Sequence, residues 1–351
     1  MTTRWNGTTR RDLLRQAILA AAWPAAVHGT VAPQGPSSVP GPRTRVGPHL
    51  GVPTFFLNDE PLTVPTFETY VPEARYFRQM ATAGCRIFSF SVNLGPGFRP
   101  PCWPGPDRWD FADLDMLARR VLDARADGLI MPRIFLQTPP WWLEQHPAEV
   151  QEIEPAEIGM RRRQRWAGYP SIASEVWRRD MAAGLHHLIE HIQAADYAGH
   201  IFGYMLTGMN TEEWYHWAVH TGNLADYAPA MQEAFRRWLR AKYREVASLR
   251  EAWSDDRVDF TSASIPSGSA RRGERARTFR DPVREMAVLD YELFYNEIIP
   301  ETIDYLAAEA KRVTQGTKVV GAFYGYMFEF GGDPEFGHNG LGRFLESPHI
   351  D

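Results

Sequence analysis

Apolar segments of strand length alternate with amphipathic segments of helix length from about residue 50 onward. Apolar runs that are bounded by glycine, proline or polar residues are typical of strands buried on both faces of a parallel sheet. The predicted strands cover residues 50–57, 86–93, 129–136, 200–207 and 318–326. This order of strands and helices predicts an α/β fold with a parallel sheet.

Between these strands, apolar residues recur at the three- and four-residue spacing of a helix, which predicts one buried face for each helix. Helices are expected at 72–83, from Phe111, from about Ser171, around 235–246 and at 282–313. The residues expected on buried faces are Leu114, Leu117, Ala118, Val121 and Leu122, then Leu185, Leu188, Ile189 and Ile192, then Ile299, Ile303, Leu306 and Ala310. Gly128 is expected to cap the second helix, and residues 144–170 and 254–281 are expected to be loops.

The pattern favours a (β/α)8 TIM-type barrel over a doubly wound nucleotide-binding sheet. The sequence has neither a Gly-x-Gly-x-x-Gly fingerprint after its first predicted strand nor a phosphate-binding loop with Gly and Lys. A complete barrel of this type has eight strands, and five are recognisable before the sequence ends at Asp351. We therefore expect a barrel that is incomplete at its C-terminus.

The N-terminal residues are expected to lie outside this barrel. Arg10 and Arg11 precede a short apolar stretch at 13–26, which is typical of a twin-arginine (Tat) export signal and too short to span a bilayer well. A helix start with a chance arginine pair is the alternative. We predict an export signal at 1–32, a linker rich in Pro, Gly and Ser at 33–48, and the barrel domain at 49–351. The expected location is periplasmic or secreted, with no membrane attachment beyond the signal.

Charge and composition limit the classes of ligand that the chain is expected to bind. The net charge of −5 leaves no basic footprint for nucleic acid. The spacing of Cys85 and Cys102 fits neither a disulfide framework nor a zinc site, although the two could pair in an exported protein. Twelve tryptophans, several beside Pro or Gly, favour flat ligands such as sugars, and ordinary core packing is the alternative. No cofactor is expected.

The fourth predicted strand ends in residues that suggest acid catalysis. Gly208 and Asn210 are followed by two adjacent carboxylates, Glu212 and Glu213, and then by Trp214. The carboxyl ends of parallel strands carry the active sites of α/β barrels. An apolar wall raises the pKa of a carboxyl group towards the range of a general acid, and an indole can stack on a sugar ring. Two solvated loop carboxylates are the alternative.

Three segments, taken in order, resemble the barrel domain of clan A glycoside hydrolases, nearest the family 42 β-galactosidases and their uncharacterised relatives. These segments are Gly105–Asp115, Pro139–Glu149, and Phe235–Trp253 continued by Phe260–Pro266. The resemblance implies hydrolysis of O-glycosidic bonds by a retaining two-carboxylate mechanism on a carbohydrate substrate, β-galactosides among the candidates. It also allows assembly into a homo-oligomer.

The resemblance implies that a Glu directly after an Asn, at the end of the fourth strand, is the general acid/base. Here Asn210 is adjacent to neither carboxylate, so the match stays open between Glu213 and Glu212. We favour Glu213 because Trp214 is its neighbour and supplies an apolar wall. In that role Glu213 protonates the glycosidic oxygen and later activates water.

The family's nucleophile is a second Glu at the end of the seventh strand, about 5 Å from the acid. Glu329 follows the last predicted strand and is the good strand-end candidate after Glu213. We expect Glu329 to line the pocket, with the nucleophile encoded beyond Asp351. If two strands escape the count, Glu329 is the nucleophile instead.

Polar and aromatic residues at the strand ends are expected to bind the substrate. Asn93 and Gln137 follow the second and third strands and face the barrel mouth. One of Trp141 and Trp142 is expected to line the cleft while the other packs. The full set of expected substrate-binding residues is Asn93, Gln137, Trp141, Trp142, Asn210, Trp214, His216, Tyr324 and Tyr326.

Two other classes of function stay open. A non-catalytic carbohydrate-binding barrel fits the displaced Asn210 and the missing nucleophile. A metal-assisted barrel enzyme is suggested by Glu213 and His216, which have the Glu-x-x-His spacing of a helical ligand pair. Since no second pair of this kind is evident, no metal is expected.

Overall fold

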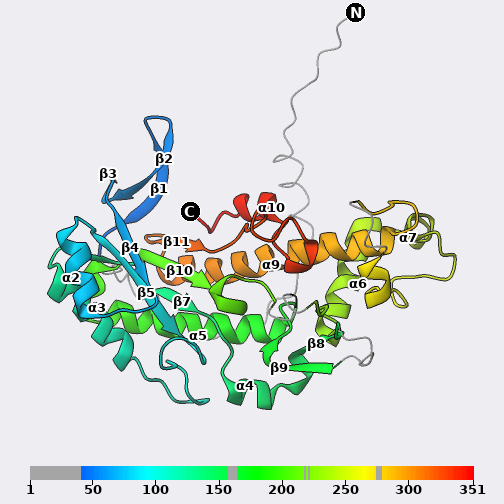
Figure 1. Cartoon of the computed structure of the whole chain (residues 1–351), viewed down its shortest axis with the longest axis horizontal. Helices are drawn as coiled ribbons and strands as arrows, with labels where there is room; N and C mark the ends of the chain where they lie inside the picture. Colours follow the sequence, from blue (N-terminus) through cyan, green and yellow to red (C-terminus); the bar gives the residue numbers. More distant parts are fainter. Residues whose placement is uncertain (1–40, 157–163, 217–218, 220–221, 274–278) are drawn as a thin grey trace, which may run out of the picture. The chain divides into compact units, whose positions relative to one another are not determined.

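A parallel sheet lies at the centre of this protein, for which a computed structural model describes residues 41–156, 164–216, 219, 222–273 and 279–351. All of these residues belong to one compact unit. The strands of the sheet follow the order β11-β10-β7-β5-β4 (Figure 1). They are β4 (Thr66–Thr69), β5 (Ile87–Asn93), β7 (Arg133–Phe135), β10 (Gly203–Thr207) and β11 (Val319–Ala322), with β6 (Leu129–Ile130) added beside β5.

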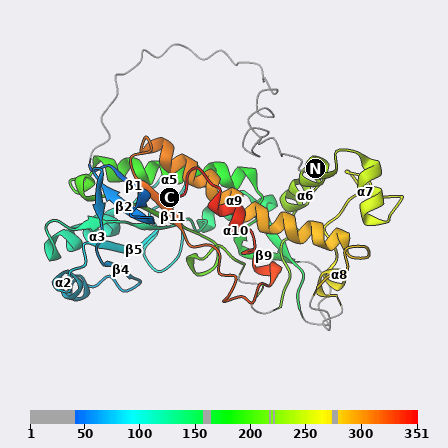
Figure 2. The same cartoon turned by 90° about the horizontal axis from the view of Figure 1, so that it is seen from above.

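Helices separate the strands of this sheet except β6 and β7, so the predicted alternation of strands and helices is confirmed. The helices before β10 are α2 (Ala74–Thr82), α3 (Ala112–Ala124), α4 (Pro140–Gln145) and α5 (Glu175–Ala194). Those after β10 are α6 (Pro229–Tyr243), α7 (Val246–Trp253), α8 (Gly268–Arg272), α9 (Met286–Val313) and, following β11, α10 (Leu341–Leu345). The two long helices, α5 and α9, pack side by side (Figure 2).

The predicted helix faces form much of the core. In α9, Ile299, Ile303 and Leu306 are fully buried, as the helical spacing predicts. The other predicted positions that are buried are Leu114, Leu117, Ala118, Val121, Leu185, Leu188, Ile189, Ile192 and Ala310. Leu122 is only partly buried against the same cluster. Each buried Leu or Ile contributes roughly 1.5–3 kcal/mol, so these faces hold the helices on the sheet.

The sheet is curved, which can be seen from the approach of residues that follow its two edge strands. β4 and β11 lie at opposite ends of the strand order. Burial raises the pKa of Tyr326, which follows β11, to about 12, and the charges of Glu213, Glu329, Tyr70 and Glu68 raise it further. Glu68 and Tyr70 belong to the end of β4. In a flat sheet, four strand spacings of about 4.8 Å would separate the two edges by roughly 19 Å. The curvature is that of a barrel wall.

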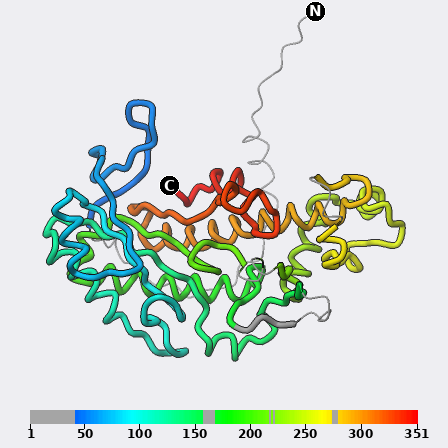
Figure 3. Tube along the Cα trace, in the orientation of Figure 1, coloured from blue at the N-terminus to red at the C-terminus, as the bar shows by residue number. Residues whose placement is uncertain are grey.

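The strand predicted at 50–57 exists but does not join the parallel sheet. It is β2 (Val52–Leu57), which pairs with β1 (Thr44–His49) and β3 (Glu60–Leu62) in a separate antiparallel sheet, the blue hairpin of Figure 3. The first parallel strand is β4, which the sequence pattern did not reveal because it is short and contains Glu68. Among the described residues the main sheet has six strands rather than the predicted five, because the strand predicted at 129–136 is divided into β6 and β7, and β4 takes the place of the strand predicted at 50–57.

The N-terminal predictions fall largely outside the described residues. The export signal at 1–32 lies outside them, as does the linker up to residue 40. The end of the predicted linker is a strand, because Thr44–His49 form β1. Within the described part of the chain, no helix has both the length and the apolarity of a membrane span.

Four local predictions need correction. The loop expected at 254–281 contains the short helix α8. The loop expected at 144–170 contains a hairpin of β8 (Val150–Ile153) and β9 (Gln164–Pro170). The helix expected from Ser171 begins at Glu175, because the side chain of Ser174 accepts a hydrogen bond from the Trp177 amide and caps it. Gly128 does not cap α3, which ends at Ala124.

Both cysteines are free and buried. Burial raises the pKa of the Cys102 thiol to about 12, with nearby aspartates adding to the effect. A thiol with a raised pKa reacts poorly, so Cys102 behaves as a core residue.

Candidate active site

The loop after β10 is wound tightly against the core. Met209, Thr211, Glu212 and Trp214 have φ angles of 57°, 44°, 75° and 57°, a left-handed conformation that non-glycine residues rarely adopt. A Cβ on Gly208 would lie 2.8 Å from the Trp214 ring, so only glycine fits there. Strain of this kind costs roughly 1 kcal/mol or more per residue and persists where surrounding contacts hold it. It is an observed feature of many functional sites.

Glu212 belongs to this loop, and its side chain is completely buried. Its Oε1 accepts a hydrogen bond of 2.8 Å from the Ser91 hydroxyl, and its Oε2 forms an ion pair with Nε of Arg133. Burial raises the pKa of Glu212 to about 6, against the lowering effects of Arg133 and Ser91. The desolvation of this carboxyl group thus outweighs its pairing with the guanidinium.

Arg133 joins residues of β4, β5 and β7 to the loop after β10. It lies in β7, directly opposite Ser91 of β5 in the parallel register, and its Nη2 donates to the Ser91 hydroxyl at 2.7 Å. Its Nη1 donates to Oε1 of Glu68 in β4 at 2.5 Å. The ring of Tyr70 covers the guanidinium, with 3.9 Å between the guanidinium carbon and the ring centroid. Glu68, Ser91, Arg133 and Glu212 are called the Arg133 cluster below.

Glu213 differs from its neighbour in exposure and partners. It is partly exposed, and its Oε2 accepts a hydrogen bond of 2.7 Å from the Thr211 hydroxyl. The Tyr215 hydroxyl lies 3.1 Å from the Thr211 hydroxyl and also interacts with the Glu213 carboxylate. The side chain of Glu213 is therefore held in place but keeps contact with solvent.

Two tyrosines lie near these carboxylates, Tyr70 near both and Tyr326 near Glu213. Burial raises the pKa of Tyr70, and the charges of Glu212, Glu213 and Glu68 add to this rise against the opposing effect of Arg133. The pKa of Tyr326 is raised by burial and also by Glu213. Residues from the ends of β4, β5, β7, β10 and β11 therefore meet at one end of the sheet, the carboxyl end that the sequence analysis predicted.

The predicted tryptophans are structural. Trp214 is fully buried, and its Nε1 donates to the Leu206 carbonyl at 3.1 Å, so it supports the loop from below. Trp142 is also buried and donates to Asp180 at 2.9 Å. Trp141 is partly buried, and its Nε1 donates to the Trp103 carbonyl at 3.2 Å. Stacking of a sugar on Trp214 does not fit this burial, which corrects that prediction, and of Trp141 and Trp142 it is Trp142 that packs in the core.

Three of the predicted polar residues are buried inside the loops. Asn93 donates to the Arg99 carbonyl at 3.2 Å and so holds the loop after β5. Asn210 is fully buried in the loop after β10. His216 stacks on Tyr295 with ring centroids 5.5 Å apart, and burial lowers its pKa to about 3. In these positions none of the three presents a polar side chain at the surface of the barrel mouth.

Gln137 lines a pocket of about 650 Å³ beside β7 and the β8–β9 hairpin. Its Nε2 donates to the Gly168 carbonyl at 3.3 Å. A second, more enclosed cavity shares Gln137 and Tyr169 with this pocket and continues to Met209, Tyr215 and His216. The second cavity is small, about 10 Å³, and lies between the pocket and the loop after β10.

Of the predicted site residues after β11, Glu329 is exposed and Tyr324 is hydrogen-bonded within the C-terminal loop. β11 ends at Ala322, so Glu329 is not at a strand end, and it is exposed. The charge of Glu329 nevertheless contributes to the raised pKa values of Tyr215 and Tyr326. The charge of Glu213 acts on the same two tyrosines, so both carboxylates lie in their surroundings. Tyr324 donates to the Gly337 carbonyl at 2.8 Å and stacks on His338, so it holds the C-terminal loop.

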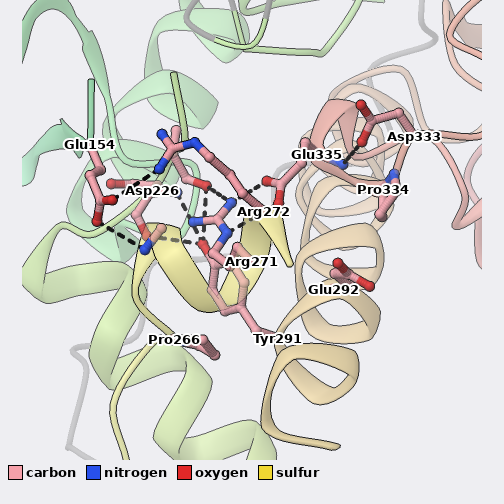
Figure 4. A network of polar contacts seen from close by, with 12 residues as sticks. Glu154, Asp226, Pro266, Arg271, Arg272, Tyr291, Glu292, Asp333, Pro334 and Glu335 are labelled. Carbon is pink, nitrogen blue, oxygen red and sulfur yellow. Dashed lines mark hydrogen bonds and ion pairs between the residues drawn. The ribbon is translucent and has the colours of Figure 1, made fainter. Parts of the chain in front are cut away.

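A second buried arginine, Arg271, lies on α8 and points towards the loop after β11 (Figure 4). It forms an ion pair with Glu335 and donates to the Ala225 carbonyl at 2.6 Å. The rings of Tyr227 and Tyr291 flank its guanidinium at 5.1 and 4.7 Å. Arg271, Glu335, Tyr227 and Tyr291 are called the Arg271 cluster below.

The Arg133 cluster was not anticipated from the sequence, although one signal was available. Arg133 is a lone charge within an otherwise apolar strand, 129–136. A buried arginine requires opposite charges, so its presence predicts carboxylate partners at neighbouring strand ends. Among the described residues, no group of three His, Cys, Asp or Glu could hold a metal ion.

Comparison with known proteins gives one family match. The model of the family described as β-galactosidase, in glycoside hydrolase family 42, matches residues 73–334. The chain is also 28% identical over 200 residues to the β-galactosidase BgaA of Thermus sp, a match that covers 55% of this chain and 27% of that protein. The β-galactosidase of Thermus thermophilus is 27% identical over 187 residues, with 53% and 25% covered. The matched region thus spans about a quarter of the length of these relatives.

Solved structures confirm the type of fold. The catalytic domain of β-amylase from Paenibacillus polymyxa superimposes with a TM-score of 0.62 at 12% identity, covering 82% of this chain and 74% of that one. The β-galactosidase from Marinomonas ef1 superimposes with a TM-score of 0.52 at 16% identity, covering 73% of this chain and 36% of that one. Both are similar in fold to the described chain, which supports the TIM-barrel type of fold.

Proposed function

Because the chain belongs to the β-galactosidase family of glycoside hydrolases, family 42, we propose that it hydrolyses β-galactosides with Glu213 as the general acid/base. A carbohydrate substrate follows from the family, whereas the activity, the sugar and the mechanism are part of the proposal. The observation that carries it is the contrast between two adjacent carboxylates at the end of β10. Glu213 is partly exposed, and Glu212 is fully buried.

A general acid must reach the glycosidic oxygen to within hydrogen-bond distance. Both oxygens of Glu212 are already engaged, one by Ser91 and the other by Arg133. Glu213 has exposed surface, and the Thr211 hydroxyl orients one of its oxygens. The raised pKa of Glu212 would suit a general acid, but accessibility comes first, so Glu212 is assigned as a positioning residue below the loop.

In the proposed reaction Glu213 donates its proton to the leaving oxygen and later removes a proton from the attacking water. The retaining mechanism also needs a nucleophilic carboxylate about 5 Å from the acid. Glu329 is exposed and lies beyond the end of β11, so we assign it to the lining of the mouth rather than to this role, and the described residues then supply the acid/base half of the retaining pair. Its charge near Tyr215 and Tyr326 supports that assignment.

Three single variants of the full chain test the proposal on aryl β-galactosides. Glu213→Gln should lower kcat by about 10²–10⁴-fold, the usual contribution of a general acid. Glu212→Gln is the matched control, with the same chemical change one residue away, and should lose less. Glu329→Gln should change mainly KM. Undiminished turnover in Glu213→Gln would remove this residue from the mechanism, and a kcat loss in Glu329→Gln as large as that expected for Glu213→Gln would make Glu329 the nucleophile.

A non-catalytic carbohydrate-binding barrel is the second candidate. The fully buried Asn210 and the arginine-paired Glu212 favour it, because neither side chain reaches the mouth. In that case the parent chain would bind galactosides without turnover. The double variant Glu212→Ala/Glu213→Ala would then keep its affinity for sugar, as measured by calorimetry.

Export by the twin-arginine route also remains a proposal, supported by Arg10 and Arg11 ahead of an apolar stretch. Replacement of both arginines by lysine should leave the protein in the cytoplasm of the producing cell. Cell fractionation measures this directly, and equal export of the variant and the parent would exclude the route.

A further inference from the structure

Two aromatic side chains stand exposed at the barrel mouth. Tyr70 follows β4 and is 42% exposed, and Phe98 lies in the loop after β5 and is 51% exposed. Their ring centroids are 4.8 Å apart at an interplanar angle of 61°. Large aromatic side chains that lie together in contact with solvent are typical of binding surfaces.

Tyr70 is held in place from below. The Arg133 guanidinium lies 3.9 Å from the Tyr70 ring centroid, and Arg133 is itself fixed by Ser91, Glu68 and Glu212. A cation–π contact with a desolvated arginine is worth about 2 kcal/mol, so the ring has little freedom to turn. The loop of Phe98 is fixed by Asn93, which donates to the Arg99 carbonyl. The aromatic pair is therefore preorganised.

A carboxylate stands beside these rings. The side chain of Glu68 is 39% exposed while one of its oxygens is bound to Arg133. Glu68 also lies near Tyr70, because its charge adds to the raised pKa of that tyrosine, as does the charge of Glu213. Glu68 therefore lies at the edge of the ring pair, and the charge of the proposed acid/base, Glu213, reaches Tyr70.

We infer that Tyr70 and Phe98, with Glu68 at their edge, form a subsite that binds a second sugar ring of the substrate, next to the ring whose bond is cleaved. The inference rests on the proposed function, because it takes the surface near Glu213 as the place of cleavage. A pyranose has an apolar face that stacks on aromatic rings and hydroxyl groups at its rim that donate to a carboxylate.

Charge argues for a neutral sugar rather than an anionic ligand. Glu68, Glu212 and Glu213 all act on Tyr70, and Arg133 is the cation among its electrostatic neighbours. Arg133 is itself buried, so it offers no positive charge at the surface. Its partner Glu68 is exposed and presents a negative charge there. A phosphate or carboxylate ligand would meet repulsion at this surface, whereas hydroxyl groups find acceptors.

The test uses calorimetry on the full chain carrying Glu213→Gln, which is expected to slow turnover during the titration. Two probes are compared, galactose and a β-linked galactose disaccharide. Adding Phe98→Ala should weaken disaccharide binding about fivefold to tenfold, the size of one lost aromatic contact. Galactose binding should change less than twofold. Tyr70→Phe should retain the affinity for the disaccharide because the ring is kept.

Two further variants control for folding. Phe98→Leu keeps apolar packing without an aromatic face and should also weaken disaccharide binding. Phe279→Ala removes an aromatic ring that is 85% exposed on another loop and should change neither affinity. Equal weakening of both probes by Phe98→Ala, or no effect on the disaccharide, would overturn the subsite, as would a chain that binds neither probe.

The outcomes also separate the subsite from the proposed function. If the parent chain turns over substrate but Phe98→Ala leaves the disaccharide affinity unchanged, the subsite alone is overturned. Absence of turnover together with disaccharide binding that depends on Phe98 supports the subsite and counts against the hydrolase.

Discussion

The Arg133 and Arg271 clusters use the same chemistry in two different places. Each has a fully buried arginine, a carboxylate partner and a tyrosine ring against the guanidinium. They differ in what remains open to solvent. Glu68 and Tyr70 of the first cluster are 39% and 42% exposed, whereas Glu335 and Tyr291 of the second are 12% and 1% exposed.

The difference shows how one type of ion pair serves two purposes. The Arg271 cluster ties α8 to the loop after β11 and closes itself off, as a structural contact does (Figure 4). The Arg133 cluster joins strand ends and presents a carboxylate and a ring at the mouth. Exposure of the partners, rather than the pairing itself, marks the cluster that belongs to the proposed site.

The largest expected effect comes from Arg133→Met, which leaves Glu212 buried without an opposite charge. Removing one partner of a buried pair costs about 3–5 kcal/mol, so the free energy of unfolding should fall by that amount. Urea denaturation followed by tryptophan fluorescence measures it. The double variant Arg133→Met/Glu212→Leu should recover most of the loss, because no buried charge remains. A loss below about 1 kcal/mol in the single variant would contradict this account of the cluster.

Arg271→Met should cost less, because its partner can reach water. The Glu335 side chain is 12% exposed and lies in a loop, so it can rehydrate once the guanidinium is gone. We expect a loss of about 1.5–3 kcal/mol in the free energy of unfolding, the range for hydrogen bonds to charged groups. Affinity for galactosides should stay within twofold of the parent. A larger effect on sugar binding than that of Arg133→Met would reverse the comparison between the clusters.

The fold was largely predictable because helical periodicity and apolar strands are local signals. The face formed by Ile299, Ile303 and Leu306 follows from spacing alone, and the structure buries it fully. β4 escaped because its identity depends on a neighbour. Its Glu68 looks unsuited to a sheet of apolar strands until Arg133 is placed beside it. Residues 50–57 had the composition of a strand, but sequence alone did not distinguish a hairpin from a parallel strand.

The candidate site was predictable in place but not in composition. The strand end at Glu212 and Glu213 was found because adjacent carboxylates after an apolar run are rare. Ser91 and Arg133 were not found because their contact arises from the register between β5 and β7. The predicted stacking of a sugar on Trp214 was wrong, since Trp214 is buried and its indole N–H donates to the Leu206 carbonyl. Trp142 is buried in the same way, with its indole N–H donating to Asp180.

A pH-dependent effect follows from Glu212. Its pKa in the folded chain is raised to about 6 from 4.5, so the folded state holds this proton more tightly than the unfolded chain does. The contribution of Glu212 to stability is then fully present below pH 4.5 and is lost as the pH rises through 6, by about 2 kcal/mol. Glu212→Gln should remove this slope from urea denaturation between pH 4.5 and 7. An unchanged slope would assign the pH dependence to another group, for which Asp226, with a pKa raised by burial to about 6, is the matched control.

The smallest expected effects come from Thr211, which orients Glu213 through its hydroxyl and has a φ of 44°. Thr211→Val removes the hydrogen bond and should lower kcat on aryl galactosides about fivefold, which corresponds to a loss of about 1 kcal/mol. Thr211→Ser keeps the hydroxyl but removes the branched Cβ, which is disfavoured at positive φ, so it should stabilise the fold by a few tenths of a kcal/mol. If the valine variant loses stability but keeps its kcat, the hydroxyl serves the loop rather than the acid. The strained loop over the Arg133 cluster would then be a structural contact like the Arg271 cluster, and the distinction between the two clusters would rest on Glu68 and Tyr70 alone.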